Sequence, residues 1–278
     1  MSEFLQQLAN VITLFFVLST MISMGLGLTV GEIVRPLKNI RFLVVSLGVN
    51  FIIAPGMVYL MTLAFSLNDP LKNGLVLVGL AAGAPALPKL AQIAKTDVAV
   101  AVSLMVLLIV VTIVFIPLLL PVVLEGVEVG FWDVARGLIL QMLLPLALAL
   151  VVRAFFKDLA DALRPFMTHA SSITLLLLIV ITIAVNFENV VSLFGSGGLL
   201  ASLIVVIVTF GTGYLLGGTG SGTRRIQALG ASQRNIADAM VVALQNFGDQ
   251  PDVLVMIVTF SVLTLIIVAP AASIFGRR

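Results

Sequence analysis

The sequence predicts an all-α polytopic membrane protein with nine transmembrane helices. Of its 278 residues, 60% are hydrophobic and only 10% are charged, and the mean hydropathy is +1.23. Apolar segments of about 20 residues, the length that a bilayer crossing needs, recur along the chain. This profile is typical of membrane proteins and excludes a soluble catalytic domain. The connections between the segments are short and polar, so we expect a single transmembrane domain over residues 1–278.

Each predicted helix is an apolar segment bounded by charged or turn-forming residues. The first ends before the polar sequence RPLKNIR, and the second ends before SLNDP. In chain order, the nine segments cover residues 8–28, 42–66, 73–94, 98–122, 134–156, 166–186, 198–217, 225–247 and 252–274. Cysteine is absent from the chain, so disulfides, thiolate metal sites and cysteine nucleophiles are excluded.

Basic residues are distributed unevenly between the two sets of connections. Lys72 and Arg136 lie in one set. The opposite set holds most of the basic residues of the chain, namely Arg35, Lys38, Arg41, Lys95, Arg153, Lys157, Arg164, Arg224, Arg225, Arg277 and Arg278. Because cytoplasmic connections of membrane proteins carry an excess of Lys and Arg, this second set is predicted to be cytoplasmic. We therefore expect a multi-pass protein of the bacterial inner membrane, with its N-terminus outside and its C-terminus in the cytoplasm.

The third segment, 73–94, is interrupted by the sequence GAPALPKL. Pro85 and Pro88 each lack a backbone N–H, and each ring clashes with the carbonyl four residues earlier, so the two residues are predicted to open the helix. Lys89 follows directly. Its ammonium either faces a buried site or extends along the helix to the cytoplasmic surface, and the sequence leaves both interpretations open.

The eighth segment, 225–247, contains a polar cluster in the sequence LGASQRNIADAM. Gly230 is predicted to permit unwinding of the backbone, so that polar side chains replace lost backbone partners or bind a ligand. These side chains belong to Ser232, Gln233, Arg234, Asn235 and Asp238. Arg234 and Asp238 lie four residues apart, within pairing distance on a helix. They form either part of a ligand site or a structural ion pair between helices.

Three charged residues lie well inside predicted spans, away from their ends: Lys89, Arg234 and Asp238. Each costs roughly 2.5–3.5 kcal/mol to insert at the bilayer centre, so we expect them to pair or to face water. The two interrupted segments have opposite orientations, and the nine segments divide into inverted repeats of four and five. Interrupted helices at corresponding places in two inverted halves indicate the binding site of a secondary transporter. Half-helix N-termini directed at the centre of the membrane favour an anionic ligand.

These features predict a secondary active transporter that moves a small organic anion across the membrane by alternating access. The predicted substrate- or ion-binding residues are Lys89, Pro85, Pro88, Ser232, Gln233, Arg234, Asn235 and Asp238. We expect no catalytic residue, no resident metal and no cofactor. The expected partners are the substrate and the lipid bilayer, with no nucleic acid and no obligatory protein partner.

An intramembrane enzyme and a channel are the alternatives from other functional classes. An enzyme needs paired acids, a histidine pair or an activated nucleophile on facing helices. The chain offers a single His and one acidic residue within its spans. A channel needs polar residues along several helices, whereas the polar residues here concentrate in two interrupted segments.

Short sequences along nearly the whole chain resemble those of one transporter family. They are GLGLTV (25–30), AKTDVAVAVSLM (94–105), PLLLP (117–121), GYLLG (213–217) and Gln233 in the second interruption. Their order and topology resemble the bile acid:sodium symporter superfamily, the sodium/bile acid cotransporter-like proteins. The resemblance implies a core domain with two crossing broken helices and a panel domain that rocks against it. Ten-helix members of the family begin with one more helix than we expect here, which would agree with a division into four and five.

The resemblance also implies where sodium ligands would lie. Sodium-coupled members carry hydroxyl and amide residues in the first interruption and a Glu four residues before the Gln of the second. Here the aligned positions are residues 85–88, which read PALP, and Leu229; only Gln233 is kept. Leucine and proline side chains offer no oxygen to a hard cation. We therefore expect the Lys89 ammonium to stand in place of sodium, with proton-coupled or uncoupled transport; the alternative is a sodium-coupled symporter of organic anions or bile acids.

Overall fold

The computed structural model describes residues 2–124, 130–247 and 249–277, and every regular element within them is helical. Arg278, one of the predicted cytoplasmic basic residues, falls outside them. The elements are α1 (Ser2–Gly27), α2 (Val30–Val34), η1 (Arg35–Lys38), α3 (Ile40–Gly48), η2 (Val49–Ile53), α4 (Ala54–Ala64), α5 (Asp69–Leu80), α6 (Leu87–Ile93), α7 (Val98–Val123), α8 (Phe131–Leu138), η3 (Ile139–Leu143), α9 (Leu144–Phe155), α10 (Lys157–Ser192), α11 (Gly198–Leu216), α12 (Ser221–Ser232), α13 (Ile236–Asn246) and α14 (Pro251–Arg277). Single π-helical turns, η2 and η3, continue α3 into α4 and α8 into α9.

Several of these helices are long and apolar enough to cross a membrane. Five qualify on their own: Ile40–Ala64, Val98–Val123, Val134–Phe155, Gly198–Leu216 and Pro251–Arg277. A further candidate joins Val11–Gly27 to Val30–Lys38 through a bend of 103°. An all-helical polytopic membrane protein, as predicted, is therefore confirmed over the described residues. The count of nine spans and their inverted repeats stay predictions.

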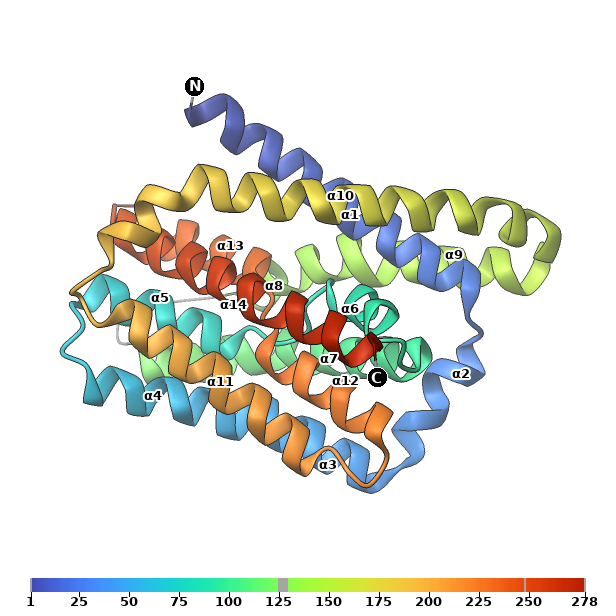
Figure 1. Ribbon diagram of the computed structural model, residues 1–278, viewed down its shortest axis with the longest axis horizontal. Coiled ribbons are helices and arrows are strands. Elements are labelled where there is room, and N and C mark those ends of the chain that lie inside the picture. The colour runs from blue at the N-terminus through green and yellow to red at the C-terminus, as the bar shows by residue number, and fades with distance from the viewer. Residues whose placement is uncertain (1, 125–129, 248, 278) are drawn as a thin grey trace.

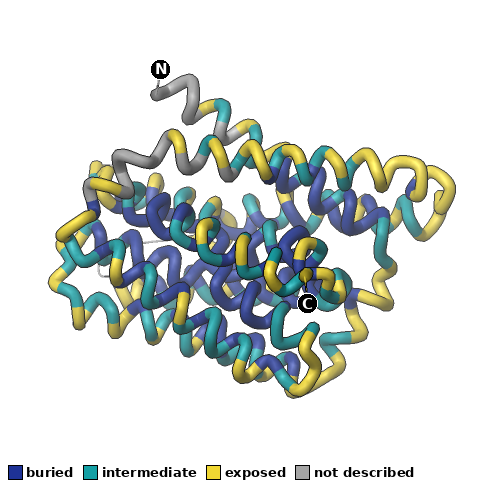
Figure 2. Tube along the Cα trace, viewed as in Figure 1, coloured by how far each residue is buried: buried dark blue, intermediate teal, exposed yellow. Residues whose placement is uncertain are grey.

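The helices form two groups that lie side by side. In the first group α1 packs against α9 and α10, along the top of Figure 1. In the second, larger group α14 packs on α5, α11 packs on α12, and α6 packs on α7. The groups meet where α10 contacts α14 and where α1 contacts α6. Figure 2 shows buried residues concentrated inside the second group and exposed residues along the outer faces.

Residues 81–86 separate α5 from α6 and interrupt the predicted third span. Pro88 lies in the first turn of α6, where its missing N–H costs no helical hydrogen bond. Gly83 has a φ of +92°, and a Cβ there would lie 2.9 Å from the amide nitrogen of Ile109 in α7. Only glycine combines this backbone conformation with so close an approach. The prolines therefore delimit the interruption, and Gly83 seats it against α7.

Residues 233–235 separate α12 from α13 and interrupt the predicted eighth span. Gln233 is extended, and its N–H closes α12 by donating to the carbonyl of Leu229. Asn235 caps α13, because its side-chain oxygen accepts a hydrogen bond from the backbone N–H of Asp238 at 3.4 Å. The polar sequence thus ends one helix and begins the next.

Gly230 lies inside α12, which corrects the prediction that it unwinds the backbone. A Cβ at this position would lie 2.6 Å from Leu104 Cδ2 and 3.2 Å from Leu87 Cδ2. Its role is therefore close packing of α12 against α7 and α6, and the unwinding begins three residues later.

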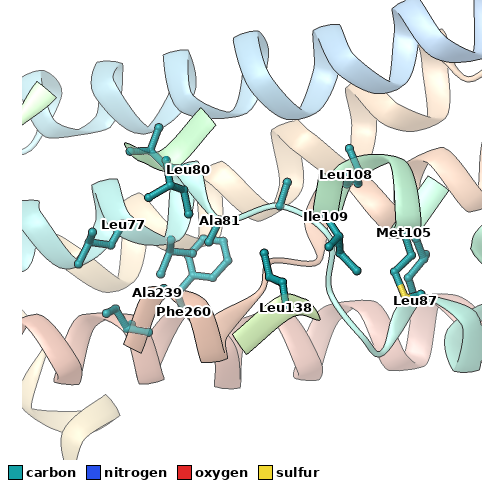
Figure 3. Close-up of a cluster of buried hydrophobic side chains, with 14 of the residues drawn as sticks. Leu77, Leu80, Ala81, Leu87, Met105, Leu108, Ile109, Leu138, Ala239 and Phe260 are labelled. Atoms are coloured by element: carbon teal, nitrogen blue, oxygen red, sulfur yellow. The ribbon is translucent and has the colours of Figure 1, made fainter. Parts of the chain in front are cut away.

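A cluster of buried hydrophobic side chains surrounds both interruptions (Figure 3). It includes Leu80, Ile109, Leu138, Ala239 and Phe260, contributed in turn by α5, α7, α8, α13 and α14. Because these side chains keep water from the surrounding backbone, each polar group there needs a partner within the protein or on a ligand.

Candidate functional site

The two interruptions contact each other directly through their backbones. The N–H of Asn235 donates to the carbonyl of Ala81 at 2.9 Å. The next carbonyl, that of Ala82, accepts a hydrogen bond from the hydroxyl of Thr112 in α7 at 3.1 Å. Carbonyls freed by the first interruption are thus satisfied by protein groups, as a low-dielectric surrounding requires. The chain brings its third and eighth predicted segments together at their unwound parts.

Arg234 is buried between the second interruption and η2, and only 3% of it is exposed. Its Nη1 lies 3.5 Å from both the backbone oxygen and Oδ1 of Asn50. Asn50 in turn donates to the carbonyl of Ser46 at 2.9 Å, and Gln227 of α12 donates to the Ser46 hydroxyl at 2.6 Å. Arg234 Nη2 has no hydrogen-bond partner among the described residues. The guanidinium therefore ends a buried polar chain with donor capacity left over.

Lys89 is also buried, but it points away from the interruptions. Its Nζ donates to Ser172 Oγ of α10 at 2.7 Å, to Gln92 Oε1 at 3.1 Å and to the carbonyl of Thr168 at 3.5 Å. Of the two interpretations of Lys89, extension to the surface is wrong, because only 6% of the residue is exposed. The ammonium connects α6 in the second helix group to α10 in the first.

Hydroxyl pairs hold α10 to α1 next to this contact. Thr20 and Ser171 lie 2.7 Å apart through their hydroxyl oxygens, and so do Ser23 and Thr168. These bonds fix the surface of α10 that receives Lys89. The ammonium therefore meets a preformed set of oxygens on one helix layer.

Asp238 faces a third direction, toward α8. A Cβ on Gly137 would lie 3.7 Å from Asp238 Oδ1, while Asp238 Oδ2 is buried and has no hydrogen-bond partner among the described residues. Asp238 lines a cavity of about 470 Å³ between α8 and α13. The cavity is also lined by Trp132, Val134, Arg136, Gly137, Leu140, Gln141, Val241 and Gln245. It runs along α13 from the second interruption toward the connection that leads to α14.

The three charged residues of the predicted spans do not pair with one another, which corrects the expected pairing of Arg234 or Lys89 with Asp238. Among the described residues, the ion pair that forms joins Arg153 and Asp161. A spacing of four residues brings side chains together only on a continuous helix. Arg234 lies in the interruption before α13 and Asp238 in its first turn, so their side chains leave in different directions.

The other predicted site residues have different roles in the structure. Gln233 is buried, and its Nε2 has no hydrogen-bond partner among the described residues, so this donor is available to a ligand. Ser232 donates to the carbonyl four residues earlier in its own helix at 2.9 Å. Pro85, Pro88 and Asn235 shape the interruptions themselves.

Sequence interpretation missed the polar residues that surround these side chains. They are Asn50, Thr112, Ser172, Gln227 and, in the cavity, Arg136, Gln141 and Gln245. The amides of Asn50 and Gln141 share a usable signal, because each is an isolated polar residue in an otherwise apolar segment. A polar group in such a segment indicates a partner or a water-filled space on that helix face.

Comparison with known proteins shows which family the chain belongs to. The sequence pattern of the Sodium Bile acid symporter family matches residues 11–193, which is more than half of the chain. The chain belongs to this family. The sodium bile acid symporter family match includes α5, α6 and the first interruption, and it ends before α11. The second interruption, at residues 233–235, lies beyond the match and is defined by the structure.

A curated protein is a distant relative of this chain. The chain is 26% identical over 191 residues to a protein of Arabidopsis thaliana named "Probable sodium/metabolite cotransporter BASS3, chloroplastic". The similarity covers 68% of this chain and 43% of that protein. This member of the sodium bile acid symporter family thus spans under half the length of the curated relative it matches.

Proposed function

We propose that the chain is a secondary active transporter, and not an enzyme, that moves a small organic anion across the membrane by alternating access without coupled sodium. The observation that carries the proposal is the hydrogen bond between Asn235 and Ala81, which joins two interrupted helices at their unwound parts. Such a junction is typical of the substrate site of secondary transporters. Membership of the sodium bile acid symporter family supports the same class of function.

The charges around the junction favour an anionic substrate. Lys89 and Arg234 are buried cations, and neither has an acidic partner among the described residues. Buried charges that lack a counterion are costly, and an anion near the junction offsets that cost for Arg234, which lies in the second interruption. Gln233 contributes an unpaired amide donor in the same place.

The two helix groups supply the moving parts that alternating access needs. The cavity lies between α8 and α13. Lys89 contacts α10, and one turn further along α6 Ile93 packs against Gly276 at the end of α14. Transport requires release of the Lys89 contact and closure of the cavity, as one group rotates against the other.

Sodium coupling is not favoured by the side chains at the first interruption. Pro85, Ala86, Leu87 and Pro88 offer no side-chain oxygen, and the carbonyls of Ala81 and Ala82 already accept hydrogen bonds. The fixed cations, Lys89 and Arg234, supply positive charge without a bound ion. Arg234 lies in an interruption, whereas Lys89 faces α10. We therefore divide between these two cations the replacement of sodium that the sequence predicts for Lys89 alone.

Uptake by purified protein in liposomes tests this function. We expect radiolabelled organic carboxylates or sulfonates to enter at saturable rates that are unchanged when sodium is replaced by potassium or choline, because no cation site has to be filled. Protein-free liposomes set the background. Strict dependence on sodium would favour the sodium-coupled symporter instead, and ion conductance without saturation would favour a channel. Absence of uptake for every organic anion would contradict the proposal altogether.

A further inference from the structure

The cavity between α8 and α13 carries opposite charges on its two walls. Arg136 of α8 is exposed to the cavity, and it makes no hydrogen bond or ion pair with any residue that the structure describes. Asp238 of α13 lies on the facing wall, with Oδ2 buried and unpartnered within the described chain. Neither residue is explained by packing alone, since no described residue bonds to the Arg136 guanidinium or to Asp238 Oδ2.

The structure places Asp238 beside α8, the helix that carries Arg136. Asp238 Oδ1 would lie 3.7 Å from a Cβ on Gly137, the residue directly after Arg136. The carboxylate therefore lies beside α8 at the residue that follows Arg136. Two opposite charges that border one cavity create a field across it that favours a ligand with complementary poles. The cavity that Arg136 and Asp238 both line leaves room for a ligand with one anionic and one donor group.

The cavity extends along α13 to the second interruption, so a ligand bound in it can reach the junction. Asp238 belongs to the first turn of α13, next to the second interruption, while Gln245 lies near the other end of the same helix. Gln141 of η3 adds an amide on the facing wall. The cavity volume of about 470 Å³ falls within the range of small-molecule sites.

We propose that Arg136 binds the carboxylate or sulfonate of the transported anion and that Asp238 accepts a hydrogen bond from an ammonium or hydroxyl group on the same molecule. The preferred substrates are then amino- or hydroxy-substituted organic acids. This inference rests on the proposed function and names its substrate class. Arginine suits the anionic pole because its planar donors match the two oxygens of a carboxylate. Asp238 suits the other pole because a charge-assisted hydrogen bond forms only with a donor.

Binding of matched acids to the purified full-length chain tests the inference. One series is propionate, lactate and the free amino acid alanine, and the other is ethanesulfonate, isethionate and taurine. In the wild type we expect the donor-bearing acids to bind at least about tenfold more tightly than the acid without a donor, since a charge-assisted hydrogen bond is worth about 1.5–3 kcal/mol. Asp238→Ala should remove this preference and leave the affinity for propionate and ethanesulfonate in place. Arg136→Gln should weaken all six ligands, and Arg136→Lys should restore part of the loss.

Control variants separate these results from unfolding. Arg153→Gln makes the same substitution in a half-buried residue of α9 that does not line the cavity, and it should leave all affinities unchanged. Each variant is first shown to elute as folded protein with a cooperative thermal transition. Equal wild-type affinity for all members of a series, or an unaltered preference in Asp238→Ala, would overturn the inference. If other organic anions are still transported, the proposed function survives that outcome, whereas loss of transport for every anion would refute both.

Discussion

Replacement of Lys89 by alanine is expected to abolish transport while leaving expression and folding intact. The substitution removes a buried positive charge and the bonds from Nζ to Ser172 Oγ and to the Thr168 carbonyl, which join α6 to α10. Hydrogen bonds to charged groups are worth about 1.5–3 kcal/mol each, so the balance between open and closed arrangements shifts by more than about tenfold. Folding is spared because Ser172 keeps its own bond to the carbonyl of Thr168 at 2.8 Å.

Two variants serve as controls for Lys89→Ala in the same uptake measurement. Lys95→Ala removes an exposed cation six residues further along and should transport at the wild-type rate. Lys89→Arg keeps the charge but changes its donor geometry, so we expect partial activity. A Lys89→Ala protein that transports normally would show that the contact with α10 has no role in the cycle.

Gln233→Ala is the second substitution expected to abolish transport. The Gln233 amide is buried at the second interruption, and its Nε2 is free of partners among the described residues, so the donor is available to the substrate. A buried donor that lacks a protein partner costs stability, which means that its removal should not destabilise the fold. We expect the substrate affinity to fall by about 10- to 100-fold, while the melting temperature stays the same or rises.

The neighbouring serine provides a matched control for Gln233→Ala. Ser232 is equally buried, but its hydroxyl donates only to carbonyls of α12, so Ser232→Ala should retain transport. Ligand-induced shifts in melting temperature for both variants report binding without relying on transport. If Gln233→Ala still binds substrate as the wild type does, the amide does not belong to the site.

Much of the fold follows from local chemistry that the sequence displays. The interruptions at residues 81–86 and 233–235 lie where the sequence places Pro85, Pro88 and the polar cluster, because these residues act on their own backbone. The role of Gly230 does not follow from local chemistry, so the prediction that it unwinds the backbone is wrong. Its function depends on Leu104, a residue more than one hundred positions away in the chain, and a single sequence carries no sign of that approach.

The candidate site was predicted less completely than the fold. The residue types and the two interruptions were identified, because buried charges stand out in apolar segments. The directions in which these charged side chains point could not be predicted, because their contacts come from helices that only the tertiary structure brings near. Lys89 contacts Ser172, Arg234 contacts Asn50, and Asp238 lies beside Gly137. Charge spacing within one helix was a poor guide once the helix itself was interrupted.

Cross-linking between the two interruptions is a direct test of whether the two interrupted helices meet at their unwound parts. The chain has no cysteine, so the double substitution Ala81→Cys and Asn235→Cys introduces a single pair of thiols. Backbone groups of these residues lie 2.9 Å apart, which brings their Cα atoms near the range of about 4.4–6.8 Å that a disulfide spans. We predict that mercuric ion or an oxidant links this pair in native membranes and leaves an Ala81→Cys, Lys95→Cys pair unlinked, as read by mass spectrometry. Failure of the first pair to link, in protein that is folded and has reactive thiols, would contradict a junction between the two helices.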